Sequence, residues 1–167
     1  MLGSLALSPV EGKRQAIKHR YLEALTLIER LHRRLLDVIK DDFERTGEKE
    51  VNPVQALLLF NISDAELTAG ELKTRGHYQG SNVSYNLKKL VEAGYVHHER
   101  SSNDKRSVRI SLTQKGHDVR KRVDQLYNRQ LQAVEEVVGL SAEEFERINK
   151  ALTRLERYWT DQILYRL

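Results

Sequence analysis

The stretch GSNVSYNLKKLVEAGYV at residues 80–96, followed by NDKRSVRISLTQKG at residues 103–116, decides the fold of this chain. In the first part, the apolar residues Val83, Leu87 and Leu90 recur at steps of four and three. This spacing places them on one face of an α-helix. The stretch therefore predicts a helix over about residues 81–93 that buries one side and exposes the other.

A hairpin is predicted directly after this helix. Gly94 suits the left-handed position that ends many helices. Residues 95–100 and 107–112 then read as two β-strands, and the second alternates apolar and polar residues at period two. Between them, the polar sequence SSNDKR at residues 101–106 is typical of a hairpin tip.

Two shorter helices are predicted upstream. Asn52 and Pro53 provide an N-cap and a proline at the first helical position, and an apolar helix follows to about Ile62. Thr68 and Glu71 fit a capping box for a third helix, with a connector between the two. The resulting order of three helices, strand, charged tip and strand is that of a winged helix, whose third helix enters the DNA major groove.

Long helices flank this core on both sides. Apolar residues at steps of three and four predict one helix over residues 13–46, and a helical pair after Thr113 with a break at Gly139. A helix of this length has one end that packs outside its own domain. The predicted fold is mainly α with a small β-wing. Its parts are a flexible arm at 1–12, the helix at 13–46, the winged helix-turn-helix core at 52–112, and the C-terminal helices at 113–167.

Charge and composition narrow the function. The chain carries 28 Lys and Arg against 24 Asp and Glu, and residues 68–112 contain eight of the former and four of the latter, so the whole excess lies in the core. A localised positive field attracts a phosphate backbone, although a solvated face with chance asymmetry gives the same count. The absence of cysteine excludes disulfides, thiolate metal sites and cysteine nucleophiles.

Several other classes find no support. No apolar run approaches the length of a membrane span, and no leader peptide is recognisable, so the expected location is the cytoplasm. The histidines have no metal-ligand spacing, and there is no phosphate loop or nucleophile elbow, so we expect no metal, no cofactor and no enzyme activity.

The outward face of the predicted helix at 81–93 has the chemistry of a DNA-reading surface. Asn pairs with adenine edges, Ser and Tyr bond to bases or phosphates, and Lys neutralises phosphate. The candidate DNA contacts on this helix are Ser81, Asn82, Ser84, Tyr85, Asn86, Lys88 and Lys89. On the hairpin tip they are Asn103, Asp104, Lys105 and Arg106, where an arginine can enter a narrow minor groove. An ordinary polar turn is the alternative for the tip.

With these residues in view, the chain resembles the MarR family of bacterial winged-helix transcription regulators. The resemblance is carried by the helix that ends in Leu90-x-x-x-Gly94, by the Asp104-x-Arg106 tip, and by the L-T-x-x-G sequence that begins the next helix at Leu112. It implies a homodimer whose N- and C-terminal helices intertwine. It also implies that Arg106 is the minor-groove arginine and Asp104 its positioning partner.

Two features depart from or refine that resemblance. The sequence at residues 78–81 differs from the commonest pattern of the family. Tyr85 differs as well, because an arginine is frequent at that position. The segment at residues 29–37 resembles an alphaproteobacterial subgroup that regulates cell-wall L,D-transpeptidase genes.

The resemblance further implies a crevice for a small phenolic or carboxylate effector. Its candidate lining is Arg34, Val38, Leu57, Phe60 and Asn61, a cation beside an apolar wall. Plain core packing, with Arg34 in an ion pair on the helix surface, is the alternative.

The sequence thus predicts a homodimeric regulator that binds a pseudo-palindromic site in double-stranded DNA and responds to a small aromatic effector. The competing hypothesis is a winged-helix module that docks a protein partner without specific DNA binding. Binding that weakens steeply with salt favours DNA.

Overall fold

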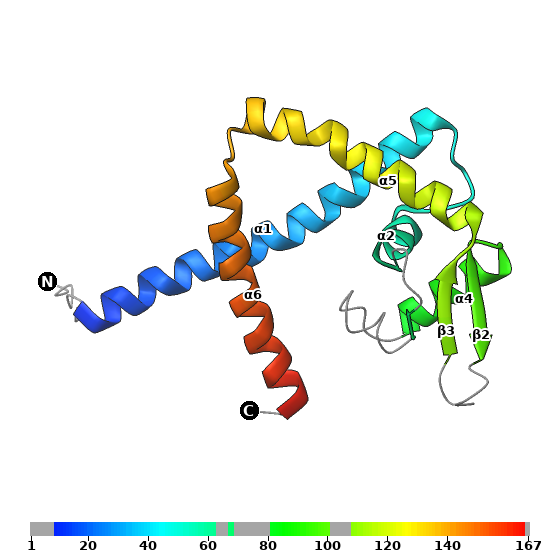
Figure 1. Cartoon of the computed structure of the whole chain (residues 1–167). Helices are drawn as coiled ribbons and strands as arrows, with labels where there is room; N and C mark the ends of the chain where they lie inside the picture. Colours follow the sequence, from blue (N-terminus) through cyan, green and yellow to red (C-terminus); the bar gives the residue numbers. More distant parts are fainter. Residues whose placement is uncertain (1–8, 63–66, 69–80, 101–107, 166–167) are drawn as a thin grey trace, which may run out of the picture. The chain divides into compact units, whose positions relative to one another are not determined.

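The computed structural model describes residues 9–62, 67–68, 81–100 and 108–165. The chain divides into two compact units, Met1–Val123 and Asp124–Leu167. The elements, labelled in Figure 1, are α1 (Pro9–Thr46), α2 (Pro53–Ile62), β1 (Leu67–Thr68), α4 (Ser81–Glu92), β2 (Val96–Arg100), β3 (Val108–Leu112), α5 (Gln114–Ala133), a π-helical turn (Val134–Val138) and α6 (Ala142–Tyr165). None of the helices in the described ranges is long and apolar enough to cross a membrane.

The sheet has three antiparallel strands in the order β1-β3-β2. β2 and β3 form the predicted hairpin, with Val96 opposite Leu112 and Arg100 opposite Val108. The third strand, β1, pairs Leu67 with Ile110. Leu67 was predicted to lie in a connector, and that assignment is wrong. Thr68 pairs with Arg109 in the same strand, and the helix that Thr68 was predicted to cap lies outside the described residues. Two residues are too few to show a period-two pattern, so their pairing depends on β3 rather than on local sequence.

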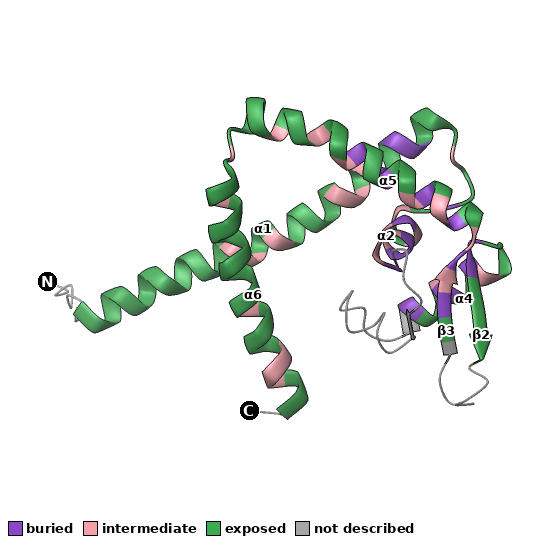
Figure 2. Ribbon diagram, in the orientation of Figure 1, coloured by how far each residue is buried: buried purple, intermediate pink, exposed green. Residues whose placement is uncertain are grey.

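The first unit has one hydrophobic core beneath the hairpin and α4. α2 is apolar on nearly all sides, which fits a helix enclosed by its neighbours, and its side chains Ala56, Leu58, Leu59 and Ile62 are buried. The C-terminal end of α1 and the first half of α5 close the core, and Figure 2 shows this burial in purple. The other fully or nearly buried apolar residues of this unit are Ile39, Phe43, Val51, Val83, Leu87, Leu90, Tyr95, Val96, Ile110, Leu112, Val119 and Val123.

α1 begins at Pro9, four residues before the predicted start at Lys13. Proline suits the first position of a helix because that residue's amide has no intrahelical acceptor, and Glu11 in the first turn complements the helix dipole. The predicted flexible arm at residues 1–12 is therefore helical from Pro9 onward, and residues 1–8 lie outside the described residues. Only the end of α1 nearest Thr46 contributes buried side chains.

The second unit contains the rest of α5, the π-helical turn and α6. The α-helical part of α5 ends at Ala133, and the π-helical turn that follows ends at Gly139, which has a φ of 71°, so the predicted break at Gly139 is confirmed. The predicted capping box is confirmed. The Ser141 amide donates to Glu144 Oε2 at 2.9 Å, and the Glu144 amide donates to Ser141 Oγ at 3.2 Å.

The boundary between the two compact units lies inside α5, after Val123, and not before Thr113. The physical reason is burial. Val119 and Val123 are enclosed by the core, whereas Leu131, two turns further along the same helix, is 63% exposed. The first half of α5 thus belongs to the winged-helix core.

Candidate nucleic-acid interface

α4 is a two-faced helix. Val83, Leu87 and Leu90 are buried at 8% exposure or less, as the spacing predicted. Ser84, Tyr85, Lys88 and Lys89 are exposed, and Tyr85 retains 61% of its surface. Burial of Leu87 and its neighbours fixes the helix to the core, and the polar face remains free for contact with a ligand.

The other predicted DNA contacts on α4 are Ser81, Asn82 and Asn86. Asn86 is half-buried instead of fully outward. Ser81 and Asn82 lie in the first turn, where the free amides of a helix N-terminus favour an anion such as phosphate. Their backbone position agrees with the predicted start of the helix.

The exposed cations of α4 have weak partners. Lys88 Nζ lies 3.9 Å and Lys89 Nζ 3.6 Å from the Glu92 carboxylate, and Lys89 also lies 5.7 Å from the centre of the Tyr85 ring. Exposed pairs of this kind contribute roughly 0.3–0.5 kcal/mol. Glu92 can therefore be exchanged for a phosphate at little cost.

The hairpin presents polar side chains on both strands. His97, His98, Glu99 and Arg100 of β2 are exposed, and Glu99 stands opposite Arg109 of β3. The tip residues that the sequence nominated, Asn103, Asp104, Lys105 and Arg106, lie outside the described residues. The strands establish where the hairpin begins and ends, and the contacts of its tip stay predictions.

Four segments meet where α4 ends and the hairpin begins. Gly94 has a φ of 79° and turns the chain out of α4. The Tyr95 amide donates to Leu90 O at 2.8 Å, and Tyr95 O accepts from the Thr113 amide at 3.1 Å. Thr113 Oγ1 donates to Gly94 O at 2.7 Å and accepts from the Gly116 amide at 3.2 Å, so it caps α5 and connects the start of α5 to the end of α4.

The loop between α1 and α2 joins this junction through side chains. Lys115 Nζ lies 2.6 Å from Glu50 Oε2, and Tyr95 Oη donates to the same oxygen at 2.8 Å. Lys115 also lies 4.3 Å from the centre of the Tyr95 ring and 3.4 Å from Ala93 O. We call Glu50, Tyr95 and Lys115 the hairpin-root cluster. Sequence reasoning missed it, because 45 and 65 residues separate Glu50 from its two partners.

The cluster alters the titration of its members. Hydrogen bonds from Lys115 and then Tyr95 hold the pKa of Glu50 below its usual value. The hydrogen bond to Glu50 raises the pKa of Lys115. Burial, and then the bond to Glu50, raises the pKa of Tyr95. All three shifts keep the charged pair and the protonated phenol together near neutral pH.

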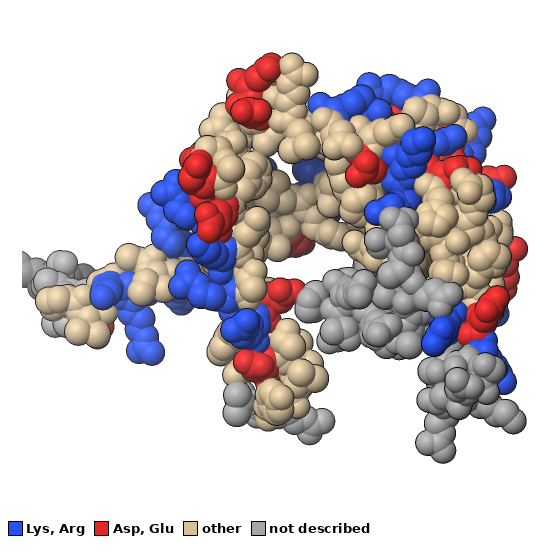
Figure 3. Space-filling view, viewed as in Figure 1, with Lys and Arg blue, Asp and Glu red and all other residues tan. Residues whose placement is uncertain are grey.

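A second ion pair ties the same loop to α5. Arg122 Nη1 lies 2.9 Å from Glu48 Oε2, and the Glu48 side chain is only 13% exposed. Lys115 and Arg122 are two helical turns apart, so both face the loop. A cavity of about 420 Å³ lies among these groups, lined by Gly47, Glu48, Lys49, Glu50, Tyr95, Lys115, Asp118, Val119 and Arg122. In Figure 3, blue and red atoms intermingle over this part of the core.

The residues predicted to line an effector crevice are only partly placed as expected. Arg34 is exposed and lies 3.1 Å from Asp37 on its own helix, which matches the alternative of a surface ion pair. Val38, Leu57, Phe60 and Asn61 are half-buried. The cation beside the apolar wall is Arg120 of α5, whose guanidinium lies 5.9 Å from the centre of the Phe60 ring. The sequence analysis did not nominate Arg120.

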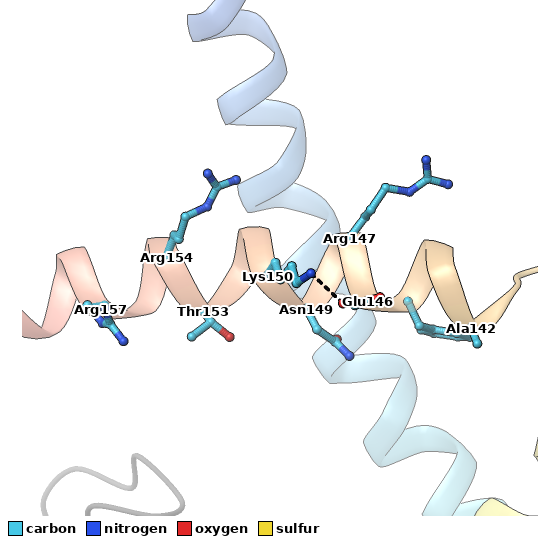
Figure 4. A pocket seen from close by; sticks show the side chains of 9 residues that line it. Ala142, Glu146, Arg147, Asn149, Lys150, Thr153, Arg154 and Arg157 are labelled. Carbon is cyan, nitrogen blue, oxygen red and sulfur yellow. Dashed lines mark ion pairs between the residues drawn. The ribbon is translucent and has the colours of Figure 1, made fainter.

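α6 carries a shallow basic groove along one side. Arg147, Lys150, Arg154 and Arg157 recur at steps of three and four, and Lys150 pairs with Glu146 (Figure 4). Figure 4 shows Arg147 and Arg154 extending to the same side of the helix. Across the ranges that the structure describes, no group of three or more His, Cys, Asp or Glu side chains could hold a metal ion.

Comparison with known sequences agrees with this geometry. Residues 51–116 match the family described as winged helix DNA-binding domain. The exopolysaccharide II synthesis transcriptional activator ExpG of Rhizobium meliloti (strain 1021) is 43% identical over 96 residues, which cover 58% of this chain and 50% of that protein. The match thus spans about half the length of this curated relative.

Solved structures show the same fold. The transcriptional regulator SlyA aligns with a TM-score of 0.70 at 18% identity, over 83% of this chain and 95% of that one. FabT of Streptococcus pneumoniae in complex with DNA aligns with a TM-score of 0.64 at 20% sequence identity. The alignment covers 84% of this chain and 98% of that one. A MarR variant of E. coli complexed with operator DNA aligns with a TM-score of 0.64 at 23% sequence identity. The alignment covers 81% of this chain and 95% of that one. These similarities extend the shared fold beyond the winged core to most of the chain.

Proposed function

We propose that this winged-helix chain is a transcription regulator of the MarR type, which acts as a homodimer bound to a pseudo-palindromic site in duplex DNA. The proposal depends on the two faces of α4, one buried and one exposed. Its apolar face is buried in a domain that matches the winged helix DNA-binding family, while Ser84, Tyr85, Lys88 and Lys89 are exposed. An exposed polar and cationic helix face in this position suits the major groove.

The arrangement of the other DNA contacts follows from the hairpin. β2 and β3 carry the chain out to residues 101–107 and back. We propose that Arg106 enters the minor groove beside the major-groove site, with Asp104 holding its guanidinium. Lys105 and Asn103 then contact the flanking phosphates.

Exposed apolar surface supports the homodimer. On α6, Phe145, Ile148, Leu152 and Trp159 are each about two-fifths exposed, at steps that place them on one side of the helix. α1 leaves further apolar side chains exposed, including Val10, Ile17, Tyr21, Leu22, Leu27 and Leu31. Exposed apolar side chains that follow one side of a helix are typical of an interface. A second copy of the chain is the partner we propose, because two DNA-reading heads then address two half-sites.

The proposed effector site lies where α2 meets α5. The half-buried Phe60 and Leu57, with the Arg120 guanidinium 5.9 Å from the Phe60 ring, provide the cation and apolar wall that an aromatic anion needs. We propose that a small phenolic or carboxylate compound binds here and shifts the population competent for DNA. A thermal-shift series with salicylate and related phenols tests this, and the absence of both stabilisation and DNA release contradicts it.

The target genes follow from two separate indications. ExpG is named for exopolysaccharide synthesis, and the segment at residues 29–37 resembles regulators of cell-wall genes. Both concern polymers of the cell envelope, so we propose target genes of that class. Genome-wide mapping of bound sites tests this proposal.

The central experiment is binding to duplex DNA as a function of salt. The wild-type chain selects duplexes from a random pool, and the affinity for the selected duplex is measured from 50 to about 200 mM salt. Phosphate contacts predict a loss of about 10³-fold or more over this range for six or more contacts. A protein-docking module selects no duplex, and that result rejects the proposal.

A further inference from the structure

We propose that the hairpin-root cluster of Glu50, Tyr95 and Lys115 is a positioning element for DNA binding, which sets the direction in which the β2–β3 hairpin leaves the core. This inference rests on the proposed DNA-binding function and extends it to residues that do not touch DNA. It assigns a role to the loop between α1 and α2, which lies outside the recognition helix and the hairpin.

Tyr95 occupies the junction between α4 and the hairpin. It is the single residue between Gly94, which ends the recognition helix, and Val96, which begins β2. Its ring is buried at 2% exposure, and its backbone bonds to both α4 and the start of α5. Any shift of Tyr95 therefore changes the angle between the recognition helix and the hairpin.

One carboxylate oxygen of Glu50 binds both Tyr95 and Lys115. Glu50 Oε2 accepts from Tyr95 Oη at 2.8 Å and from Lys115 Nζ at 2.6 Å. Charge-assisted hydrogen bonds are stronger and more directional than neutral ones. The Lys115 ammonium also lies over the Tyr95 ring at 4.3 Å, so the phenol is held at its edge and at its face.

The loop that carries Glu50 is anchored at both of its ends. Gly47 has a φ of 78° and ends α1, and the Glu48 amide donates to Phe43 O at 3.0 Å. At the other end, the Asn52 amide donates to Gln55 Oε1 at 3.1 Å, and the Gln55 amide donates to Asn52 Oδ1 at 2.8 Å. A carboxylate on an anchored loop can position a partner, because little of its own freedom is left to lose.

Replacement of Glu50 distinguishes a positioning role from a purely electrostatic one, because the two predict changes in DNA affinity of opposite sign. Replacing Glu50 removes a negative charge, so long-range attraction to DNA rises. A positioning role predicts instead that Glu50→Ala weakens binding about three- to tenfold, in the range of coupling between residues in contact. Tyr95→Phe, which leaves the net charge unchanged, is expected to weaken binding in the same direction.

Glu44→Ala is the matched control. Glu44 is an acidic residue of α1, 66% exposed and paired with Lys40 at 3.8 Å, whereas Glu50 is 64% exposed. Its replacement removes the same charge without touching the hairpin root, so we expect binding equal to or tighter than that of the wild type. Unfolding midpoints are measured for every variant, and binding is compared at a temperature where each variant is folded.

A double-mutant cycle with Arg106 then separates positioning of the hairpin from a general structural effect. If Glu50 acts through the hairpin, Glu50→Ala has little further effect on affinity in an Arg106→Ala background, and the two losses are not additive. Additive losses overturn the inference, as does wild-type or tighter binding by Glu50→Ala. Failure of the wild-type chain to select any duplex rejects the proposed function itself, so the two failures are distinguishable.

Discussion

Gly116, in the first turn of α5, lies so close to the carbonyl oxygen of Tyr95 that a Cβ atom at position 116 would overlap it. The same Cβ would also stand 3.2 Å from Leu112 Cδ2. The obstacle at Tyr95 is backbone, held by its bond from the Thr113 amide, and cannot move as a flexible side chain would. The glycine of the L-T-x-x-G sequence thus allows α5 to cross the root of the hairpin at close range.

Gly116→Ala is therefore expected to destabilise the protein by about 2 kcal/mol, as overpacking of a well-filled site does. The better helix propensity of alanine opposes this by less than about 1 kcal/mol. Urea unfolding measures the change. Gly12→Ala in α1 is the control, because nothing lies within 4 Å of a Cβ there, and it is expected to be neutral or stabilising.

Leu152→Asp is expected to weaken or abolish the homodimer without unfolding the winged-helix core. The side chain is 43% exposed in the single chain and lies among the apolar residues of α6, so a buried carboxylate in the interface would be unpaired. Sedimentation over a concentration series measures the assembly. Thr153→Asp, on an exposed neighbouring position outside the apolar stripe, should leave the dimer intact. A dimer that survives Leu152→Asp argues against α6 as the interface.

Asn86→Ala and Arg106→Ala are expected to affect DNA binding in different ways. Loss of a base contact at Asn86 relaxes sequence preference by about 1–3 kcal/mol at one position. Loss of Arg106 lowers affinity strongly, and its minor-groove contact depends on groove width more than on a single base. Competition between the selected duplex and single-base variants distinguishes the two. Unchanged affinity for Arg106→Ala would show that the hairpin tip is not a DNA contact.

Lys88→Ala is expected to weaken binding to all duplexes alike and to lower the slope of log affinity against log salt by about one. In the proposed complex, the exposed Lys88 of α4 neutralises a phosphate and reads no base. Stability should change little, since its pair with Glu92 at 3.9 Å is exposed. A loss confined to the selected duplex would instead identify Lys88 as a base contact.

The hairpin-root cluster also predicts how stability depends on pH. The folded pKa of Glu50 is lowered, so its contribution is present above the unfolded value and disappears as pH falls through the folded pKa. The pKa of Lys115 is raised, so its contribution is present below the unfolded value and disappears only as pH rises through the folded pKa. Urea unfolding is measured at pH values from neutral to acid. As the pH falls, the free energy of unfolding should decrease less for Glu50→Gln than for the wild type. Parallel curves for the two proteins would indicate that the Glu50 pair adds no stability.

Much of the local structure could be predicted from sequence. The start of α4 at Ser81, the end marked by Gly94, and the Ser141 capping box all agree with the structure. Helix caps and helix faces depend on residues within four positions of one another, so the sequence contains all their partners. The same reasoning identified the buried face of Val83, Leu87 and Leu90.

Features that depend on remote partners could not be predicted in this way. β1 exists because Leu67 meets Ile110, and Arg120, not Arg34, lies beside Phe60. The amphipathic pattern also runs through Leu131 as clearly as through Val123, yet only Val123 is covered by its own chain. Periodicity shows which face a helix would bury and does not show what covers it.

The sequence by itself determined the two-faced helix α4, the hairpin that follows it and their caps, because these follow from neighbouring residues and from the intrinsic conformations of glycine and proline. Only the tertiary structure decided that Glu50, Tyr95 and Lys115 share one oxygen at the hairpin root. Their separations along the chain are too long for any local pattern, and only the folding of the core brings them within hydrogen-bonding distance.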